Sequence, residues 1–175
     1  MNVKEIPIES PIEEKIAWAK NCHRERRADL LQDEEVGFLL KELKVAIRAS
    51  HREMARTGII ESCGLCEEKE GGSCCGAGLE KKYTGLLLLI NLLLGHPIPG
   101  RRQDPSGCFF LGKEGCGLLS RQVICINYLC KRITDQIDPH QLAPLREKEG
   151  IELGLLFRLN ERIKKILATI EASAA

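Results

Sequence analysis

The sequence predicts a mainly α fold, a helical domain of about five helices with two cysteine-rich loops and a short β-hairpin. Leucine and isoleucine recur at helical spacing in several long segments. Residues that favour helix starts and helix ends flank most of these segments. Of the nine cysteines, eight fall within two loop-rich stretches, residues 63–75 and 108–130. The chain of 175 residues can bury an apolar core without help from disulfides.

We expect one domain over residues 1–175. Within it, residues 1–58 form an N-terminal helical hairpin, residues 59–136 a cysteine-cluster core and residues 137–175 a C-terminal helix. The apolar faces of the second, third and last helices form the core. The two cysteine loops meet at one end of it.

The first two helices are predicted from their ends. Ser10, Pro11 and Glu13 have the form of a capping box, which predicts a helix over about 11–31. Asp33 predicts the cap of a second helix, whose apolar residues from Val36 to Met54 share one face. Gly58 can take the left-handed conformation that ends it.

The rest of the chain alternates between loops and helices. The sequence predicts a loop over residues 59–76 and a helix over the leucine-rich residues 78–94. Residues 101–120 predict a loop containing a hairpin between 108–111 and 116–119. A helix capped by Ser120 follows over about 121–136, and a long final helix covers about 144–172.

Composition and local sequence patterns narrow the classes of protein to which the chain can belong. A net charge of +1 and an aromatic content of 4% give no support for nucleic-acid binding. The apolar run from Leu86 to Leu94 is about half the length of a membrane span. The N-terminal residues lack the pattern of a signal peptide. These observations predict a cytoplasmic protein without membrane partners, in which thiols stay reduced and bind metal or carry out redox chemistry.

The spacing of the cysteines supports a metal site. The first group is C-x2-C-x7-C-C and the second is C-x7-C-x8-C-x4-C. A C-x2-C pair lets two thiolates reach one ion from a single turn, as in zinc and iron–sulfur sites. Adjacent cysteines point in different directions, so the vicinal pair can serve two ions or leave one thiol unbound. The candidate ligands are Cys63, Cys66, Cys74, Cys75, Cys108, Cys116, Cys125 and Cys130.

Other interpretations of these residues exist. Cysteine often serves as a small buried apolar residue, and this alternative applies most to Cys125 and Cys130, which fall on a predicted helix. Cys22 lies in the first predicted helix, away from both groups, and is expected to be an ordinary core or surface residue. The four histidines have no metal-ligand spacing to a cysteine pair.

The order of these elements resembles a known family. The pattern comprises Cys63-x2-Cys66, Cys74-Cys75, Cys108-Phe-Phe-Leu, Gly115-Cys116, Arg121 and Cys125-x4-Cys130. It is similar to the YkgJ-type cysteine-cluster family, described as zinc- or iron-chelating CxxCxxCC domains. The chain departs from that family in a longer gap before Cys74 and in Gln122, where the family commonly has proline. The resemblance covers about 63–130 and implies metal chelation.

Three functions remain open from the sequence. The first is a metal-binding protein in which thiolates hold an iron–sulfur cluster or zinc, for electron transfer, redox support or structure. The second is a thiol-dependent enzyme in which Lys81 activates Cys74 or Cys75. The third is a metal-handling adaptor. A protein redox or client partner is expected for the first and third.

Overall fold

A computed structural model of the chain describes residues 5–69 and 74–174. The helices are α1 (Ile12–Gln32), α2 (Glu34–Arg56), α3 (Ile59–Lys69), the 3-10 helix η1 (Leu79–Lys82), α4 (Gly85–Leu93), α5 (Val123–Asn127), α6 (Lys131–Gln136) and α7 (Pro139–Ala174). Strands β1 (Leu111–Gly112) and β2 (Gly115–Cys116) pair antiparallel. The predicted mainly α fold with a short hairpin is confirmed.

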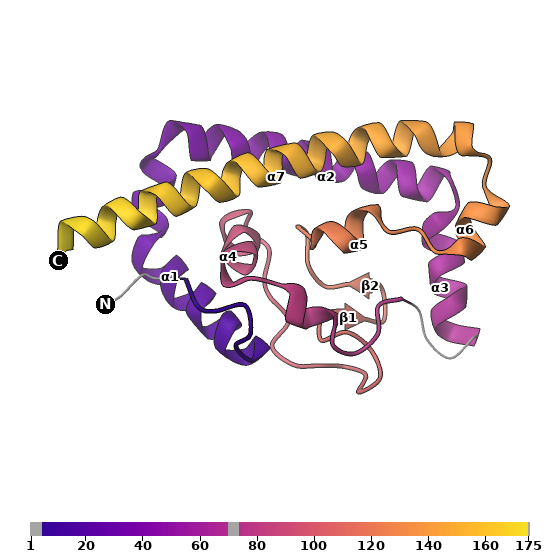
Figure 1. The fold of residues 1–175 in the computed structure, drawn as a ribbon, viewed down its shortest axis with the longest axis horizontal. Coiled ribbons are helices and arrows are strands. Elements are labelled where there is room, and N and C mark those ends of the chain that lie inside the picture. Colours follow the sequence, from indigo (N-terminus) through magenta and orange to yellow (C-terminus); the bar gives the residue numbers. More distant parts are fainter. Residues whose placement is uncertain (1–4, 70–73, 175) are drawn as a thin grey trace.

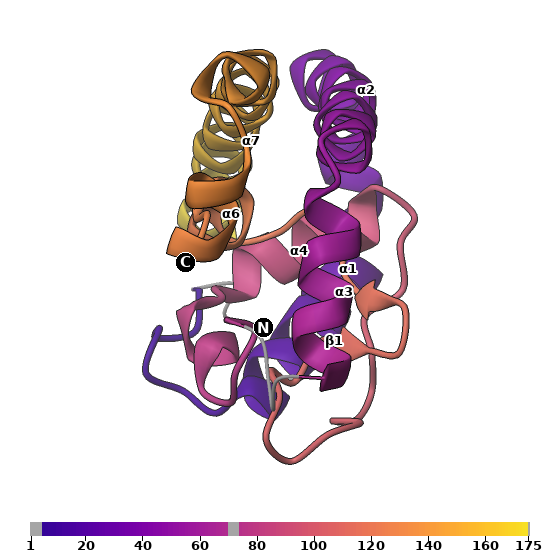
Figure 2. The same ribbon diagram turned by 90° about the vertical axis from the view of Figure 1, so that its right-hand side faces the viewer.

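One layer of the molecule consists of α2 and α7, which run antiparallel along its length (Figure 1). Ion pairs join them near both ends of α2. Arg162 Nη2 lies 2.5 Å from Asp33 Oδ2, and Lys148 Nζ lies 3.9 Å from Glu53 Oε2. Figure 2 shows α2 and α7 side by side, with the cysteine-bearing segments in a second layer below them. The layer of α2 and α7 therefore covers the cysteine-bearing segments.

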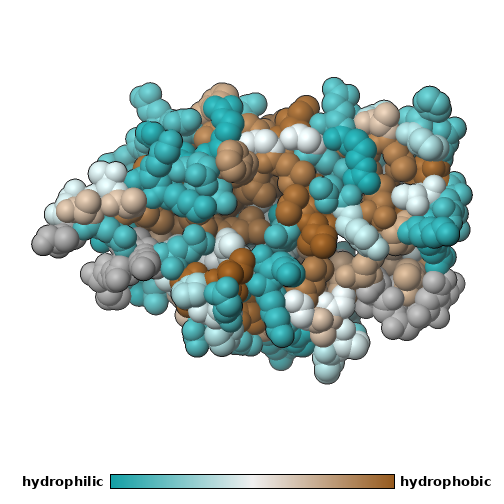
Figure 3. All heavy atoms as spheres, viewed as in Figure 1, coloured by the Kyte–Doolittle hydropathy of each residue, from teal (hydrophilic) through white to brown (hydrophobic). Residues whose placement is uncertain are grey.

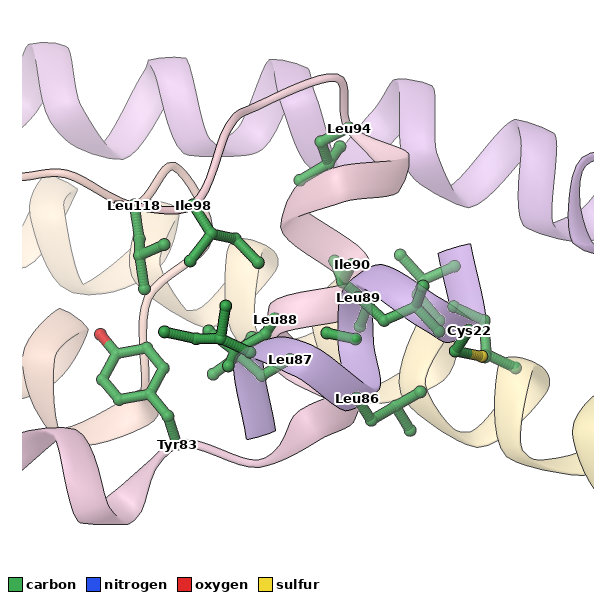
Figure 4. Close-up of a cluster of buried hydrophobic side chains, with 14 of the residues drawn as sticks. Cys22, Tyr83, Leu86, Leu87, Leu88, Leu89, Ile90, Leu94, Ile98 and Leu118 are labelled. Atoms are coloured by element: carbon green, nitrogen blue, oxygen red, sulfur yellow. The ribbon is translucent and has the colours of Figure 1, made fainter. Parts of the chain in front are cut away.

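The main apolar core lies beneath the layer of α2 and α7 and is centred on α4. Leu86, Leu88, Leu89 and Ile90 are almost fully buried, so α4 is apolar on all sides and is enclosed by other elements (Figure 4). The core continues into α1, α2 and α7 and also contains Tyr83. Among the described residues, no helix is both long and apolar enough to span a membrane.

Hydrophilic side chains dominate the outline of the molecule, and apolar residues appear mainly near the centre of the face drawn in Figure 3.

The first two helices do not pack as the predicted hairpin. The chain turns sharply at Asp33, and α1 then lies mainly against α4, whereas α2 lies mainly against α7 (Figure 1). Burial explains this arrangement. The apolar residues of α1, including Ile16 and Ala19, pack into the same cluster as Leu86 and Leu89 of α4.

Several predicted boundaries are corrected. The helix predicted over 78–94 is divided into η1 and α4, and the hairpin strands are 111–112 and 115–116 instead of 108–111 and 116–119. Residues 59–69 form α3 instead of a loop, because Gly58 ends α2 at φ 74 and Ile59 then packs against Ile133 and Leu145. The helix predicted over 121–136 is split into α5 and α6 by extended backbone at Tyr128 and Cys130. The final helix begins at Pro139 and accommodates Pro144 in its second turn. Residues 70–73 of the predicted loop lie outside the described residues.

The predicted helix caps have mixed outcomes. Asp33 caps α2 as predicted, with Oδ1 accepting a hydrogen bond from Val36 N at 3.0 Å. Ser10 does not cap α1, which starts after Pro11 without a side-chain cap. The side chain of Gln122, instead of Ser120, caps α5. The backbone N and O of Ser120 bond to the side chain of Asn91, and its buried hydroxyl has no hydrogen-bond partner among the described residues.

Replacing Asp33 with alanine should lower the free energy of unfolding by about 1–2 kcal/mol at neutral pH. The change removes the cap of α2 and the ion pair with Arg162. The hydrogen bond from Arg162 lowers the pKa of Asp33, so its contribution is present above the unfolded pKa of about 3.9 and is lost as the pH falls through the folded value.

Urea unfolding at neutral pH and near pH 3 measures this effect, with Glu42→Ala on the exposed face of α2 as the control. An equal loss at both pH values would contradict a role for the carboxylate charge.

Candidate metal centre

The eight predicted ligands come from six separate segments of the fold. Cys63 and Cys66 lie on α3, and Cys74 and Cys75 follow the segment after it. Cys108 precedes β1, and Cys116 ends β2. Finally, α5 carries Cys125, and Cys130 lies immediately before α6. A shared site therefore requires long-range contacts that bring these segments together.

Backbone pairing brings the first two loops together. Gly76 and Gly107 form an isolated antiparallel β-bridge, and Cys108 N donates to Cys75 O at 2.6 Å. A further bond joins Ala77 N to Ser106 O at 2.9 Å. These bonds place Cys75 beside Cys108, although 32 residues separate them in the sequence. The proximity of the two predicted cysteine regions is thus built into the backbone.

A buried carboxylate fixes the same junction. Glu80 is 4% exposed, and its side chain accepts hydrogen bonds from Arg102 at 2.6 Å, Gly78 N at 3.0 Å and Phe109 N at 3.3 Å. Arg102 also donates to Gly107 O. Burial opposes ionisation of Glu80, but these hydrogen bonds, led by that from Arg102, hold its pKa below the usual value. Glu80 and Arg102 therefore tie η1 to both cysteine loops.

The first thiol group contains Cys63, Cys66, Cys74, Cys75 and Cys130. Burial raises the pKa of Cys63 to about 11, and the four other thiols raise it further as nearby negative groups. Burial, together with Cys75, Cys130 and Cys66, also raises the pKa of Cys74. Cys63 and Cys74 therefore lie near enough to the other thiols of this group for those thiols to affect their pKa values.

The second thiol group contains Cys75, Cys108, Cys116 and Cys125. Burial raises the pKa of Cys108 to about 11, with Glu80, Cys116 and Cys125 adding to the effect. Residue 116 is exposed as a whole, yet its thiol is desolvated, and this raises its pKa. Burial likewise raises the pKa of Cys125, with contributions from Cys116 and Cys75.

The structure places Cys130 differently from its sequence group. Cys130 precedes α6, which packs against α3 through a small apolar cluster containing Ile59, Ile133 and Leu145. Cys63 and Cys130 both border this cluster. Sequence spacing assigned Cys130 to the second group, whereas the packing of α3 against α6 places it in the first. Cys75 acts on thiols of both groups and so connects them.

Arg121 is the cation that influences the second thiol group. Its guanidinium lowers the pKa of Cys116 and of Cys125, partly opposing the effect of burial. Arg121 also contacts α2, because its Nη2 lies 3.5 Å from Met54 Sδ. Of the basic residues near the cysteines in sequence, Arg121 thus has the clearest electrostatic link to them.

Sequence reasoning missed two residues that position this region. Asn91 is fully buried on α4; its side chain donates to Ser120 O and accepts from Leu119 N and Ser120 N, each at 2.9 Å. Tyr83 Oη lies 3.7 Å from Cys125 Sγ and accepts from Gln122 N at 3.3 Å. A single amide within the leucine-rich run was the sequence signal for Asn91. Tyr83 had no comparable signal.

Replacing Asn91 with leucine should lower the free energy of unfolding by about 3 kcal/mol, because three backbone groups of Leu119 and Ser120 lose buried partners. Thermal unfolding measures the loss. Asn127→Ala, at an exposed side chain, is the control and should have little effect. Equal stability of Asn91→Leu and the parent would show that these bonds do not hold the segment before Arg121.

The donor set fits a thiophilic metal. Sulfur ligands suit zinc and iron–sulfur clusters. A bound cation would reduce the electrostatic repulsion between thiolates that lie close together. No disulfide joins the nine cysteines, all of which belong to the described residues. Across residues 5–69 and 74–174, no three side chains of ligand type are already arranged to hold one ion. The thiols are therefore gathered into groups without a closed coordination geometry.

The remaining candidates lie outside these groups. Cys22 is buried in the main apolar core, as expected for a structural residue. His96 Nε2 lies 3.1 Å from Gly117 O. His51 belongs to α2, where burial, and then Arg121, lower its pKa to about 4.

No protein-family model, curated protein or solved structure matches this chain.

Proposed function

We propose that this chain is a metal-binding cysteine-cluster protein that holds an iron–sulfur cluster or zinc through cysteine thiolates. The supporting observation is the gathering of eight cysteines from six segments into two thiol groups that share Cys75. The cytoplasmic location and the redox or client partner predicted from the sequence belong to this proposal.

The raised pKa values support metal binding over nucleophilic chemistry. A catalytic cysteine needs a lowered pKa so that its thiolate is available. The pKa of Cys74 is instead raised, first by burial and then by Cys75. A bound metal ion replaces the proton and stabilises the thiolate directly. A thiol-dependent reaction at Cys74 is therefore the less favoured alternative.

The two forms of the proposal differ in chemistry. Four thiolates closed around zinc would stabilise the fold, since a catalytic zinc keeps an open position. An iron–sulfur cluster would supply electron transfer, with its potential set by nearby amides and solvent access. In either form Cys63, Cys66, Cys74 and Cys130 would hold one metal centre, and Cys108, Cys116 and Cys125 would hold another, with Cys75 available to both.

A metal-handling adaptor is a second candidate, favoured by the exposure of Cys74 at the edge of the first thiol group. A thiol of a client protein can replace a metal ligand more readily where that ligand is exposed. Rapid loss of metal to a chelator would support transfer, and slow loss would support a resident site.

Metal and sulfide content, with the absorption spectrum of protein purified without oxygen, tests the proposal. Iron, sulfide and a broad visible absorption would identify a cluster, and a colourless protein with stoichiometric zinc would identify a zinc site. Protein containing neither, and unable to take up either, would overturn the proposal.

A further inference from the structure

The side of α2 that points away from the core carries exposed basic and apolar side chains. The core side of this helix is marked by buried residues such as Val36, Leu39 and Leu43. Figure 2 shows the other elements lying beside and below α2, so its opposite side borders solvent. We call this side the outer face of α2. Its exposed residues include Phe38, Lys41, Lys44, Val45, Arg48 and Arg52.

The outer face of α2 has the spacing of a helix that packs along a second helix. Successive residues on one line are separated by three, four, three and four positions, which is a heptad pattern: Phe38, Lys41, Val45, Arg48 and Arg52. This line covers about 21 Å of helix axis, at 1.5 Å per residue. The core contacts of α2 lie on its other side, so the line is open to a further helix.

Two positions on this line are apolar. The exposed fraction is 54% for Phe38 and 60% for Val45. Single exposed apolar residues are common on protein surfaces, but these two lie two turns apart on the same line. Their side chains would be covered by apolar residues of a helix that lay along α2.

The basic side chains of the outer face have no acidic partner. Within residues 5–69 and 74–174, no ion pair involves Lys41, Lys44, Arg48 or Arg52. The neighbouring helix α7 differs, because carboxylates pair with most of its basic residues, namely Arg146, Lys148, Arg158, Arg162 and Lys164. The whole chain has a net charge of only +1. The outer face of α2 is therefore a local excess of positive charge.

We propose that the outer face of α2 is a docking surface for an acidic amphipathic helix of a partner protein. Apolar residues of that helix would cover Phe38 and Val45, and its carboxylates would pair with Arg48 and Arg52. Complementary charges along a heptad line determine which helices pair. The inference is independent of metal binding, because this face lies on the side of α2 that points away from the cysteine-bearing segments.

The same features disfavour other occupants. A second copy of this chain would bring an equally basic face, and like charges would repel. A nucleic acid would pair with the cations through phosphate groups but would leave Phe38 and Val45 without apolar contacts. A membrane surface favours a helix with a wide apolar face, whereas this line has two apolar positions. An acidic helix is the occupant that uses both the charges and the apolar residues.

Binding of a synthetic acidic helix tests the proposal. The probe is a fluorescent peptide of about three heptads, with leucine at the seam positions and glutamate at the flanking positions. Repulsion between its glutamates keeps it from pairing with itself. A scrambled peptide has the same composition without the heptad order. Fluorescence anisotropy with the full-length protein should show binding that weakens as salt is raised. The scrambled peptide should bind at least about tenfold more weakly.

Two variants separate the charged and apolar parts of the surface. The Arg48→Glu, Arg52→Glu double variant should weaken peptide binding at least about tenfold, because like charges then face one another. Val45→Ser should weaken it about fivefold through lost apolar burial. The Arg101→Glu, Lys113→Glu double variant changes the net charge equally at exposed positions outside α2 and should bind as the parent does.

Chemical-shift mapping of the parent protein locates the contact without a variant. The amides of residues 38–52 should respond to the peptide more than those of α4. No binding by the parent, equal binding of the scrambled peptide, or a response centred elsewhere would overturn the inference. Tighter binding of a single-stranded oligonucleotide or of anionic lipid vesicles, lost in the Arg48→Glu, Arg52→Glu variant but retained in Val45→Ser, would also overturn it. None of these results bears on the metal content, so failure of the docking surface and failure of the proposed function are distinguishable.

Discussion

Replacing either Cys63 or Cys130 with serine should abolish metal binding at the first thiol group and lower the free energy of unfolding by at least about 3 kcal/mol. The two residues are 67 positions apart in the sequence, but both lie in the first thiol group and border the same apolar cluster. A single serine in either place leaves an incomplete ligand set. In the proposed metal-bound protein, the ligands would add to the small apolar cluster that joins α3 to α6.

The Cys63→Ser, Cys130→Ser double variant tests whether both residues bind the same metal centre. If Cys63 and Cys130 serve one metal centre, the double variant should lose no more metal than either single variant, because effects within one site are not additive. Cys108→Ser should retain the metal of the first group. Metal analysis and thermal unfolding provide the readouts.

Cys22→Ala is the control, since Cys22 lies in the main apolar core and not in either thiol group. It should lower stability modestly and leave the metal content unchanged. Independent, additive losses from Cys63 and Cys130 would contradict their assignment to one group.

Replacing Arg102 with alanine should lower the free energy of unfolding by about 3 kcal/mol. Glu80 would remain buried without its cationic partner, and Gly107 O would lose its side-chain donor. Because Glu80 and Arg102 hold η1 against both cysteine loops, metal affinity should fall as well. Chemical denaturation and zinc titration measure the two effects.

Arg101→Ala is the matched control for this prediction, since the exposed neighbour has the same charge. It should change neither quantity appreciably. Parental stability of Arg102→Ala would show that the ion pair contributes little, and the proposed anchoring of the loops would then be wrong.

Local signals in the sequence were sufficient for much of the fold. Asp33 and Gly58 marked the limits of α2, and the leucine-rich run predicted a buried helix that the structure contains as α4. These features depend on capping and periodicity, which neighbouring residues determine. The same reasoning failed at α3, because cysteine and glycine suggested a loop, whereas Ile59 packs against Ile133 and Leu145 from a helix.

Long-range packing was beyond the reach of the sequence. Nothing local indicates that α1 lies against α4 or that α6 brings Cys130 to Cys63. The burial of Glu149 and Glu152 was also not predicted, since both resemble ordinary surface residues of a charged helix until α2 covers them. The cysteines were predicted as ligands from spacing, whereas their division into two groups sharing Cys75 required the three-dimensional arrangement.

X-ray absorption spectroscopy of protein purified without oxygen is the most direct test of the central claim, that thiolates from distant segments hold the metal. We expect a first coordination shell of sulfur alone, at about 2.3 Å for zinc, or sulfur together with iron neighbours for a cluster. A first shell dominated by nitrogen or oxygen would contradict the account, and so would protein that binds no metal after reduction and reconstitution.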